Sequence, residues 1–98
     1  MAQVSTSVGA GARGGKVFTQ QAPTATPAQI LASDGRRINV SIYNNGTQTV
    51  YLGADSTVSS STGLPLPAGA VLDDQSSYGA WWAVVASGTG DLRICEVS

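Results

Sequence analysis

The sequence predicts an all-β fold, a small antiparallel β-sandwich of jelly-roll-like form with an extended, glycine-rich N-terminal arm. Apolar and polar residues alternate strictly over Arg37–Asn44, which is the pattern of a half-buried strand. Turn-forming residues recur between short apolar runs, and no long stretch shows helical periodicity. We therefore divide the 98-residue chain into an arm over residues 1–26 and a β-sandwich domain over residues 27–98.

The arm consists mainly of small residues, and its composition cannot bury enough apolar surface to order the chain by itself. We expect a short strand at Lys16–Gln20 within it. Two interpretations remain open for the arm, a disordered terminus or a segment that becomes ordered on a neighbouring subunit. In the second case Val17 and Phe18, two of its few large apolar residues, are candidate interface residues.

The sandwich domain accounts for the other strands. The two prolines of Gly63–Gly69 exclude a fully paired central strand, so this segment belongs at an edge or outside the sheets. Residues 73–79 are expected to form a loop. The expected strands, in order, are Ala28–Ala32, Arg37–Asn44 with Ile38, Val40 and Ile42 inward, Thr49–Leu52, Val71–Leu72, Ala80–Ala86 and Asp91–Val97.

Asn45-Gly46 is a strong signal for a β-hairpin. A strict two-residue loop would place the inward Ile42 opposite Thr49, so we expect a longer connection or a bulge at Gly46. Residues 42–52 and 84–94 have a weak internal similarity, because each stretch has the pattern of a strand, a Gly-Thr turn and a second strand. We interpret the similarity as two hairpins that follow the same turn rules.

The composition excludes several kinds of chemistry. With no histidine and one cysteine, the chain has no His-based triad, no His/Cys metal cluster and no disulfide framework. Asp73 and Asp74, with Asp55 or Asp91, lack the calcium-loop pattern, and we interpret them as solvated carboxylates. We expect no enzyme activity, no catalytic residue, no metal and no cofactor.

Net charge and hydropathy bear on partners and location. A net charge of −1 argues against nucleic acid or an anionic membrane as the main partner. Neither a secretory signal nor a membrane-spanning stretch is recognisable, so we expect synthesis in the cytoplasm.

Aromatic residues are the main candidates for an interaction surface. Trp81 and Trp82 are neighbours in a strand, so one ring points to the core and the other away from it. A central strand covered on both faces, a subunit interface and a sugar-stacking platform all remain possible interpretations. We take Trp81, with Tyr43, Tyr51 and Tyr78, as the outward-facing interface set.

Arg36 and Arg37 follow a glycine turn. They can pair with Asp34 or another acidic neighbour where the strand begins, or they can anchor the acidic surface of a partner. We include both arginines among the candidate interface residues.

A family resemblance rests on the spacing and turn residues of five stretches, Ala28–Ala32, Arg36–Gly46, Val50–Gly53, Gly63–Gly69 and Ala83–Arg93. Over residues 28–98 the chain resembles small β-sandwich structural proteins of tailed bacteriophages, which act as head decoration or cement proteins or in fibre and tail roles. The resemblance implies a non-enzymatic virion protein on the capsid surface, with the phage major capsid protein as its partner. It supplies no motif residue whose role can be transferred individually.

The size of the β region independently favours self-association. A domain this small, without a disulfide or metal, gains from burying Trp81, Tyr43 and Tyr51 against identical neighbours. We therefore expect a homo-oligomer, specifically a closed trimer. The alternative function is a fibre or tail protein, or a module that stacks its aromatic patch on carbohydrate.

Overall fold

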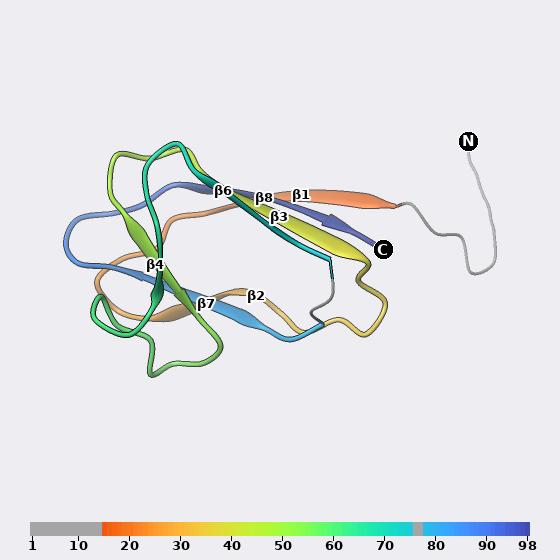
Figure 1. Ribbon diagram of the computed structural model, residues 1–98, viewed down its shortest axis with the longest axis horizontal. Helices are drawn as coiled ribbons and strands as arrows, with labels where there is room; N and C mark the ends of the chain where they lie inside the picture. The colour runs from red at the N-terminus through yellow and green to blue at the C-terminus, as the bar shows by residue number, and fades with distance from the viewer. Residues whose placement is uncertain (1–14, 76–77) are drawn as a thin grey trace.

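The computed structural model describes residues 15–75 and 78–98 and confirms a small all-β sandwich (Figure 1). Within these residues there is no helix of the length and apolarity needed to cross a membrane. The eight strands are β1 Lys16–Gln21, β2 Ala28–Leu31, β3 Asn39–Asn44, β4 Val50–Gly53, β5 Leu64–Leu66, β6 Val71–Asp74, β7 Trp81–Val85 and β8 Leu92–Val97.

The strands form two antiparallel four-stranded sheets, ordered β1-β8-β3-β6 and β2-β7-β4-β5. We call them the first and the second sheet. Their pairings are nested: β1 pairs with β8, β2 with β7, β3 with β6, and β4 with β5. Only the β4–β5 connection joins neighbours in one sheet, and every other connection between described strands passes from one sheet to the other. This nested order is that of a jelly roll.

The expected hairpin at Asn45-Gly46 is wrong, because β3 and β4 lie in different sheets. Both strands still turn an apolar face to the core, one from each sheet, so the chain needs no hairpin register to keep them buried. The buried Asn44 shapes the corner: its Oδ1 accepts the Gly46 N–H at 3.0 Å, and its Nδ2 donates to the carbonyls of Gln48 and Leu66, each at 2.8 Å.

The internal similarity between residues 42–52 and 84–94 does not reflect two hairpins, and that interpretation is wrong. β7 and β8 also lie in different sheets, while β3 pairs with β8 and β4 pairs with β7. The two segments are therefore two sheet-crossing arches, packed side by side in opposite directions. The Asn45 N–H donates to the Asp91 carbonyl at 2.8 Å where their corners meet.

The core lies between the sheets and corrects two expected orientations. Trp81 packs against the core, so Trp82 is the outward-facing residue of the pair. Ile38, expected inward, precedes β3 and is exposed. The buried core consists of Ile30, Leu31, Val40, Ile42, Val50, Leu52, Leu66, Ala83, Val85, Leu92 and Ile94.

The sandwich begins earlier in the chain than the expected boundary after residue 26. The short strand expected at Lys16–Gln20 is present as β1, an edge strand of the first sheet. The chain then crosses the end of the sandwich, where the Pro23 and Thr24 carbonyls accept the N–H groups of Gly90 and Val85. The glycine-rich residues 1–14 of the expected arm lie outside the described residues.

The two other local expectations have different outcomes. Leu64–Leu66 is an edge strand, β5, as the two prolines of Gly63–Gly69 predict. By contrast, β6 continues to Asp74 by pairing with β3, so the loop expected over residues 73–79 starts later.

Candidate interaction surface

The outer face of the first sheet brings together side chains from strands that are far apart in the sequence. Cross-strand register places Phe18 of β1, Cys95 of β8 and Ser41 of β3 in one row. The next row contains Gln20, Arg93 and Tyr43 in the same strand order. All six occupy alternate positions, so their side chains leave the sheet on the side away from the core.

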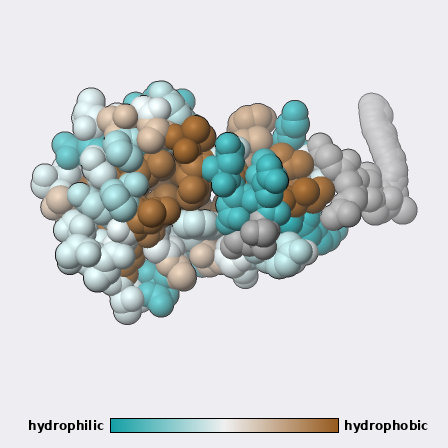
Figure 2. Space-filling model, in the orientation of Figure 1, coloured by the Kyte–Doolittle hydropathy of each residue, from teal (hydrophilic) through white to brown (hydrophobic). Residues whose placement is uncertain are grey.

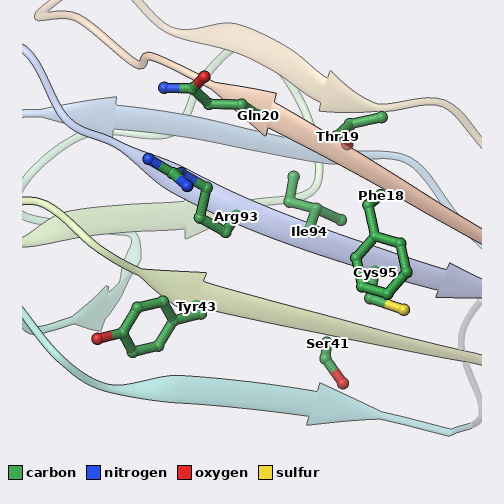
Figure 3. Close-up of a pocket in the computed structure, with 8 residues that line it drawn as sticks. All are labelled: Phe18, Thr19, Gln20, Ser41, Tyr43, Arg93, Ile94 and Cys95. Atoms are coloured by element: carbon green, nitrogen blue, oxygen red, sulfur yellow. The ribbon is translucent and has the colours of Figure 1, made fainter.

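These two rows form a shallow groove of about 490 Å³, which we call the outer groove. Figure 3 shows Phe18 standing on β1 over Cys95, with Tyr43 on β3 across the strand β8. The groove therefore has aromatic side chains on two sides and the polar ends of Gln20 and Arg93 at one end. It is lined by Phe18, Thr19, Gln20, Ser41, Tyr43, Arg93, Ile94 and Cys95.

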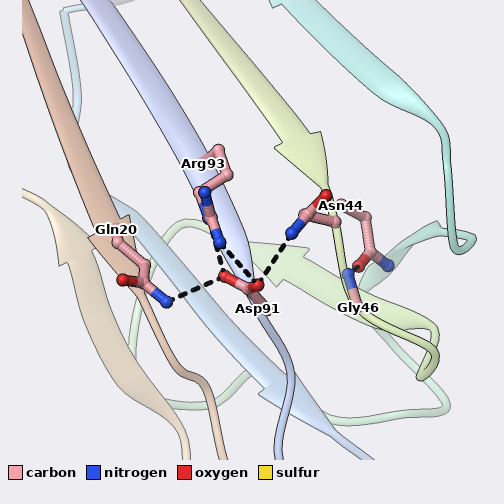
Figure 4. A network of polar contacts seen from close by, with 6 residues as sticks. Gln20, Asn44, Gly46, Asp91 and Arg93 are labelled. Carbon is pink, nitrogen blue, oxygen red and sulfur yellow. Dashed lines mark hydrogen bonds and ion pairs between the residues drawn. The ribbon is translucent and has the colours of Figure 1, made fainter.

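The polar end of the groove is held by the carboxylate of Asp91 (Figure 4). Gln20 Nε2 and Asn45 Nδ2 donate to its two oxygens at 3.1 and 3.0 Å. Arg93 binds both oxygens through Nε at 3.0 Å and Nη2 at 3.1 Å. The arginine bonds, followed by the Asn45 bond, lower the pKa of Asp91 to about 2. Asp91 thus ties β1, the corner after β3, and β8 together.

β1 differs from the other strands of the first sheet because both of its faces are open to solvent. Phe18 on the outer face is 73% exposed, and Val17 on the opposite face is 54% exposed. The second sheet therefore does not cover the inner side of β1 at Val17, although Gln21 at the other end of the strand donates to the Ile30 carbonyl of β2 at 3.3 Å. Two adjacent apolar residues lie exposed on one edge strand.

The tyrosines expected to form one aromatic patch are separated. Tyr43 is exposed at the outer groove. Tyr51 lies half-buried on β4 in the second sheet, so the two rings cannot share a surface. Tyr78 is exposed in the β6–β7 connection, where its carbonyl accepts the Asp34 N–H at 2.9 Å.

The two arginines have different environments. Arg36 is exposed, and its backbone N–H donates to the Asp34 carboxylate at 2.9 Å. Arg37 is only 2% exposed and forms an ion pair with Glu96 at 3.0 Å. It also donates to the Gly79 and Ala32 carbonyls. Arg37 is therefore a buried residue that pairs with an acidic neighbour inside the fold. The expectation that it forms part of an interface is wrong.

From the sequence we did not predict Gln20, Ser41, Arg93 or Cys95 as residues of the outer groove, nor Asp91 as the centre of its network. Alternation in Arg37–Asn44 places Ser41 on an outward face, and alternation in Asp91–Val97 does the same for Arg93. Cys95, which the sequence alone suggests as a small core residue, lies half-buried on the same outer face. What was missing was the pairing of β8 with both β1 and β3, which brings these faces together.

In the part of the chain that the structure describes, the rest of the surface shows no second groove that matches the outer groove. Figure 2 shows apolar residues near the middle of the face drawn, among more hydrophilic areas. In residues 15–75 and 78–98, no three His, Cys, Asp or Glu side chains are grouped as metal ligands. Among the residues that the structure describes, the large exposed apolar ones are Val17, Phe18, Ile38, Tyr43, Leu64, Val71 and Tyr78.

Comparison with protein-family models gives no match, and comparison with curated proteins gives none either. The outer groove and β1 must therefore be interpreted from their own chemistry.

Proposed function

We propose that this chain is a structural protein of a bacteriophage virion, a capsid decoration protein that bridges coat subunits at the capsid surface. It has no catalytic role, and its partners are further copies of itself and the major capsid protein. The observation that carries the proposal is β1, which leaves Val17 and Phe18 exposed on opposite faces of one edge strand.

Two further features support this proposal. Jelly rolls recur in viral capsid proteins and in lectins, so the nested strand order suits a virion protein, although a fold alone does not define a function. The resemblance of residues 28–98 to small phage sandwich proteins points in the same direction. The expected trimer remains a prediction that solution mass measurements can test.

The proposal is tested by the resistance of virions to heat. Virions that lack the protein should release DNA at a lower temperature than complete virions, and adding the purified chain should restore resistance. Phe18→Ser should restore it poorly, whereas Leu64→Ser, which changes an exposed apolar residue in the second sheet, should restore it fully. Equal heat resistance with and without the protein would remove the bridging role.

A second candidate function is carbohydrate binding at the outer groove. The specific observation that favours it is the pair of exposed rings, Phe18 and Tyr43, beside the polar ends of Gln20 and Arg93. Aromatic faces with polar groups beside them suit a sugar ring. A glycan-array screen should then show binding by the parent that Tyr43→Ala abolishes, and no binding by the parent dismisses this function.

A further inference from the structure

The free edge of β1 has the features of a strand that pairs with another strand. The Gly15 and Ser98 backbones exchange hydrogen bonds at 3.0 and 3.1 Å, which fixes the phase of the β1–β8 ladder. Because antiparallel bonding alternates along a strand, Val17, Thr19 and Gln21 also direct their N–H and C=O groups to β8. The backbone groups of Lys16, Phe18 and Gln20 consequently point to the free edge.

The other three sheet edges carry devices that discourage such pairing. β5 contains Pro65, β2 has a register shift between Gln29 and Leu31, and β6 carries Asp73 and Asp74. By contrast, β1 runs through six regular pairs with β8, contains no proline, and has one charged residue, Lys16. No described strand pairs with its free edge.

We propose that β1 binds β1 of a second copy of this chain, antiparallel and about a two-fold axis through Phe18. This register uses all three edge-facing residues, since Phe18 then faces Phe18 of the partner subunit and Lys16 faces the partner subunit's Gln20. Registers centred on Val17 or Thr19 pair only two edge-facing residues each way. The first sheet of one subunit then continues into the first sheet of the other, and both outer grooves lie on the same side of the joined sheet.

Charge permits this arrangement and space favours it. Gln20 donates to Asp91, whose carboxylate is paired with Arg93, so Lys16 approaches a cluster of the partner subunit that has no net charge to repel it. The exposure of Val17 shows that the second sheet does not extend beneath this part of β1, which leaves room for a neighbour on the inner side there. Two Phe18 rings, each 73% exposed in one chain, lie side by side and cover each other.

This inference deepens the proposed function by naming the contact through which copies self-associate. A two-fold contact uses the same patch on both subunits and closes as a dimer. It therefore predicts a dimer for the purified chain, in place of the trimer expected from the sequence.

Disulfide trapping tests the register directly. The native Cys95 is first replaced by alanine, because it lies opposite Phe18 within one chain and would capture a cysteine there. Phe18→Cys should then give a covalent dimer on mild oxidation, since opposed residues of a hydrogen-bonded pair have Cα atoms about 5.5 Å apart, within disulfide range. Val17→Cys and Thr19→Cys are the matched controls and should stay monomeric on denaturing gels. Efficient cross-linking at either control position and not at 18 would overturn the register.

Sedimentation velocity tests the contact without cysteine chemistry. The parent should have twice the monomer mass, and Phe18→Pro should be a folded monomer, because the N–H that proline removes faces the free edge and not β8. Thermal unfolding of Phe18→Pro checks that it is folded. Phe18→Ala keeps the N–H and should weaken the dimer by about tenfold or more.

A monomeric or trimeric parent would overturn the inference. These experiments use purified protein without capsids, so their failure is separate from that of the proposed function. A monomer that still protects virions contradicts the contact alone, and a dimer that has no effect on virions contradicts the function alone.

Discussion

At the scale of single residues, two charged side chains hold distant parts of the chain together through ion pairs and hydrogen bonds. Arg37 links the turn before β3 to Glu96 on β8 and to the carbonyls of Ala32 and Gly79. Asp91 performs a similar task at the surface by binding Gln20, Asn45 and Arg93. These contacts order the corners that a jelly roll needs where the chain passes between sheets.

The Asp91 network predicts a dependence of stability on pH. Its folded pKa of about 2 lies below the value of about 3.9 for an unfolded aspartate, so its contribution is present above that unfolded value and is lost as the pH falls towards 2. Asp91→Asn should lower the thermal midpoint at pH 6, and the difference from the parent should shrink between pH 5 and pH 2. Scanning calorimetry of both proteins measures it, and a difference independent of pH would contradict the role of this carboxylate.

Gly53 predicts a steric effect on the outer side of the second sheet. A Cβ atom there would lie 2.6 Å from Cβ of Val58, a buried residue of the β4–β5 connection. Gly53→Ala should therefore destabilise the fold by about 1–3 kcal/mol. The matched control is Gly35→Ala, where a Cβ would meet nothing within 4 Å, and urea unfolding compares the two variants. Equal midpoints would show that Val58 moves aside freely.

At the scale of elements, β1 combines a complete ladder with little core contact. Its six residues pair with β8, but none belongs to the core cluster. Its contribution to folding therefore rests mainly on backbone hydrogen bonds, together with side-chain bonds from Gln20 to Asp91 and from Gln21 to the Ile30 carbonyl. Val17 and Phe18 remain available to a partner.

Removing β1 should weaken the sandwich without abolishing it. A chain beginning at Ala22 retains Pro23 and Thr24, whose carbonyls bind Gly90 and Val85 across the end of the sandwich. Compared with a chain beginning at Gly15, we expect a loss of about 1–3 kcal/mol, the order of a few net hydrogen bonds after chain ordering is counted. Urea unfolding followed by tryptophan fluorescence measures this. An unfolded shorter chain would show that β1 is essential to the core.

The sequence predicted the strands better than their partners, for a physical reason. Alternation over Arg37–Asn44 determines which residues face the core, but it is satisfied equally in either sheet. Asn45-Gly46 consequently indicated a hairpin, although the chain crosses to the other sheet there. Tyr43 was identified because it points outward from an alternating strand, and Phe18 because large apolar residues are few in the arm. The rest of the outer groove depends on strand pairing between residues such as Gln20 and Arg93, which no local pattern encodes.

At the scale of the whole molecule, the two outer faces of the sandwich differ. On the second sheet, Val58 packs over Gly53, and the half-buried Tyr51 lies opposite the buried Val84. On the first sheet, the outer groove is open and continues to the exposed edge of β1. The β1 edge of the first sheet therefore combines the exposed Phe18 side chain, unpaired backbone groups and the neighbouring outer groove. This combination is the one expected of an assembly surface.

The most direct test of this account is binding of the purified chain to virions that lack it, measured by cosedimentation over a range of concentrations. We predict saturable binding by the parent and by Leu64→Ser, and a loss of binding for Phe18→Ser. Absence of binding by the parent, or equal binding by Phe18→Ser, would contradict the claim that this sandwich attaches to a capsid as a dimer paired through β1.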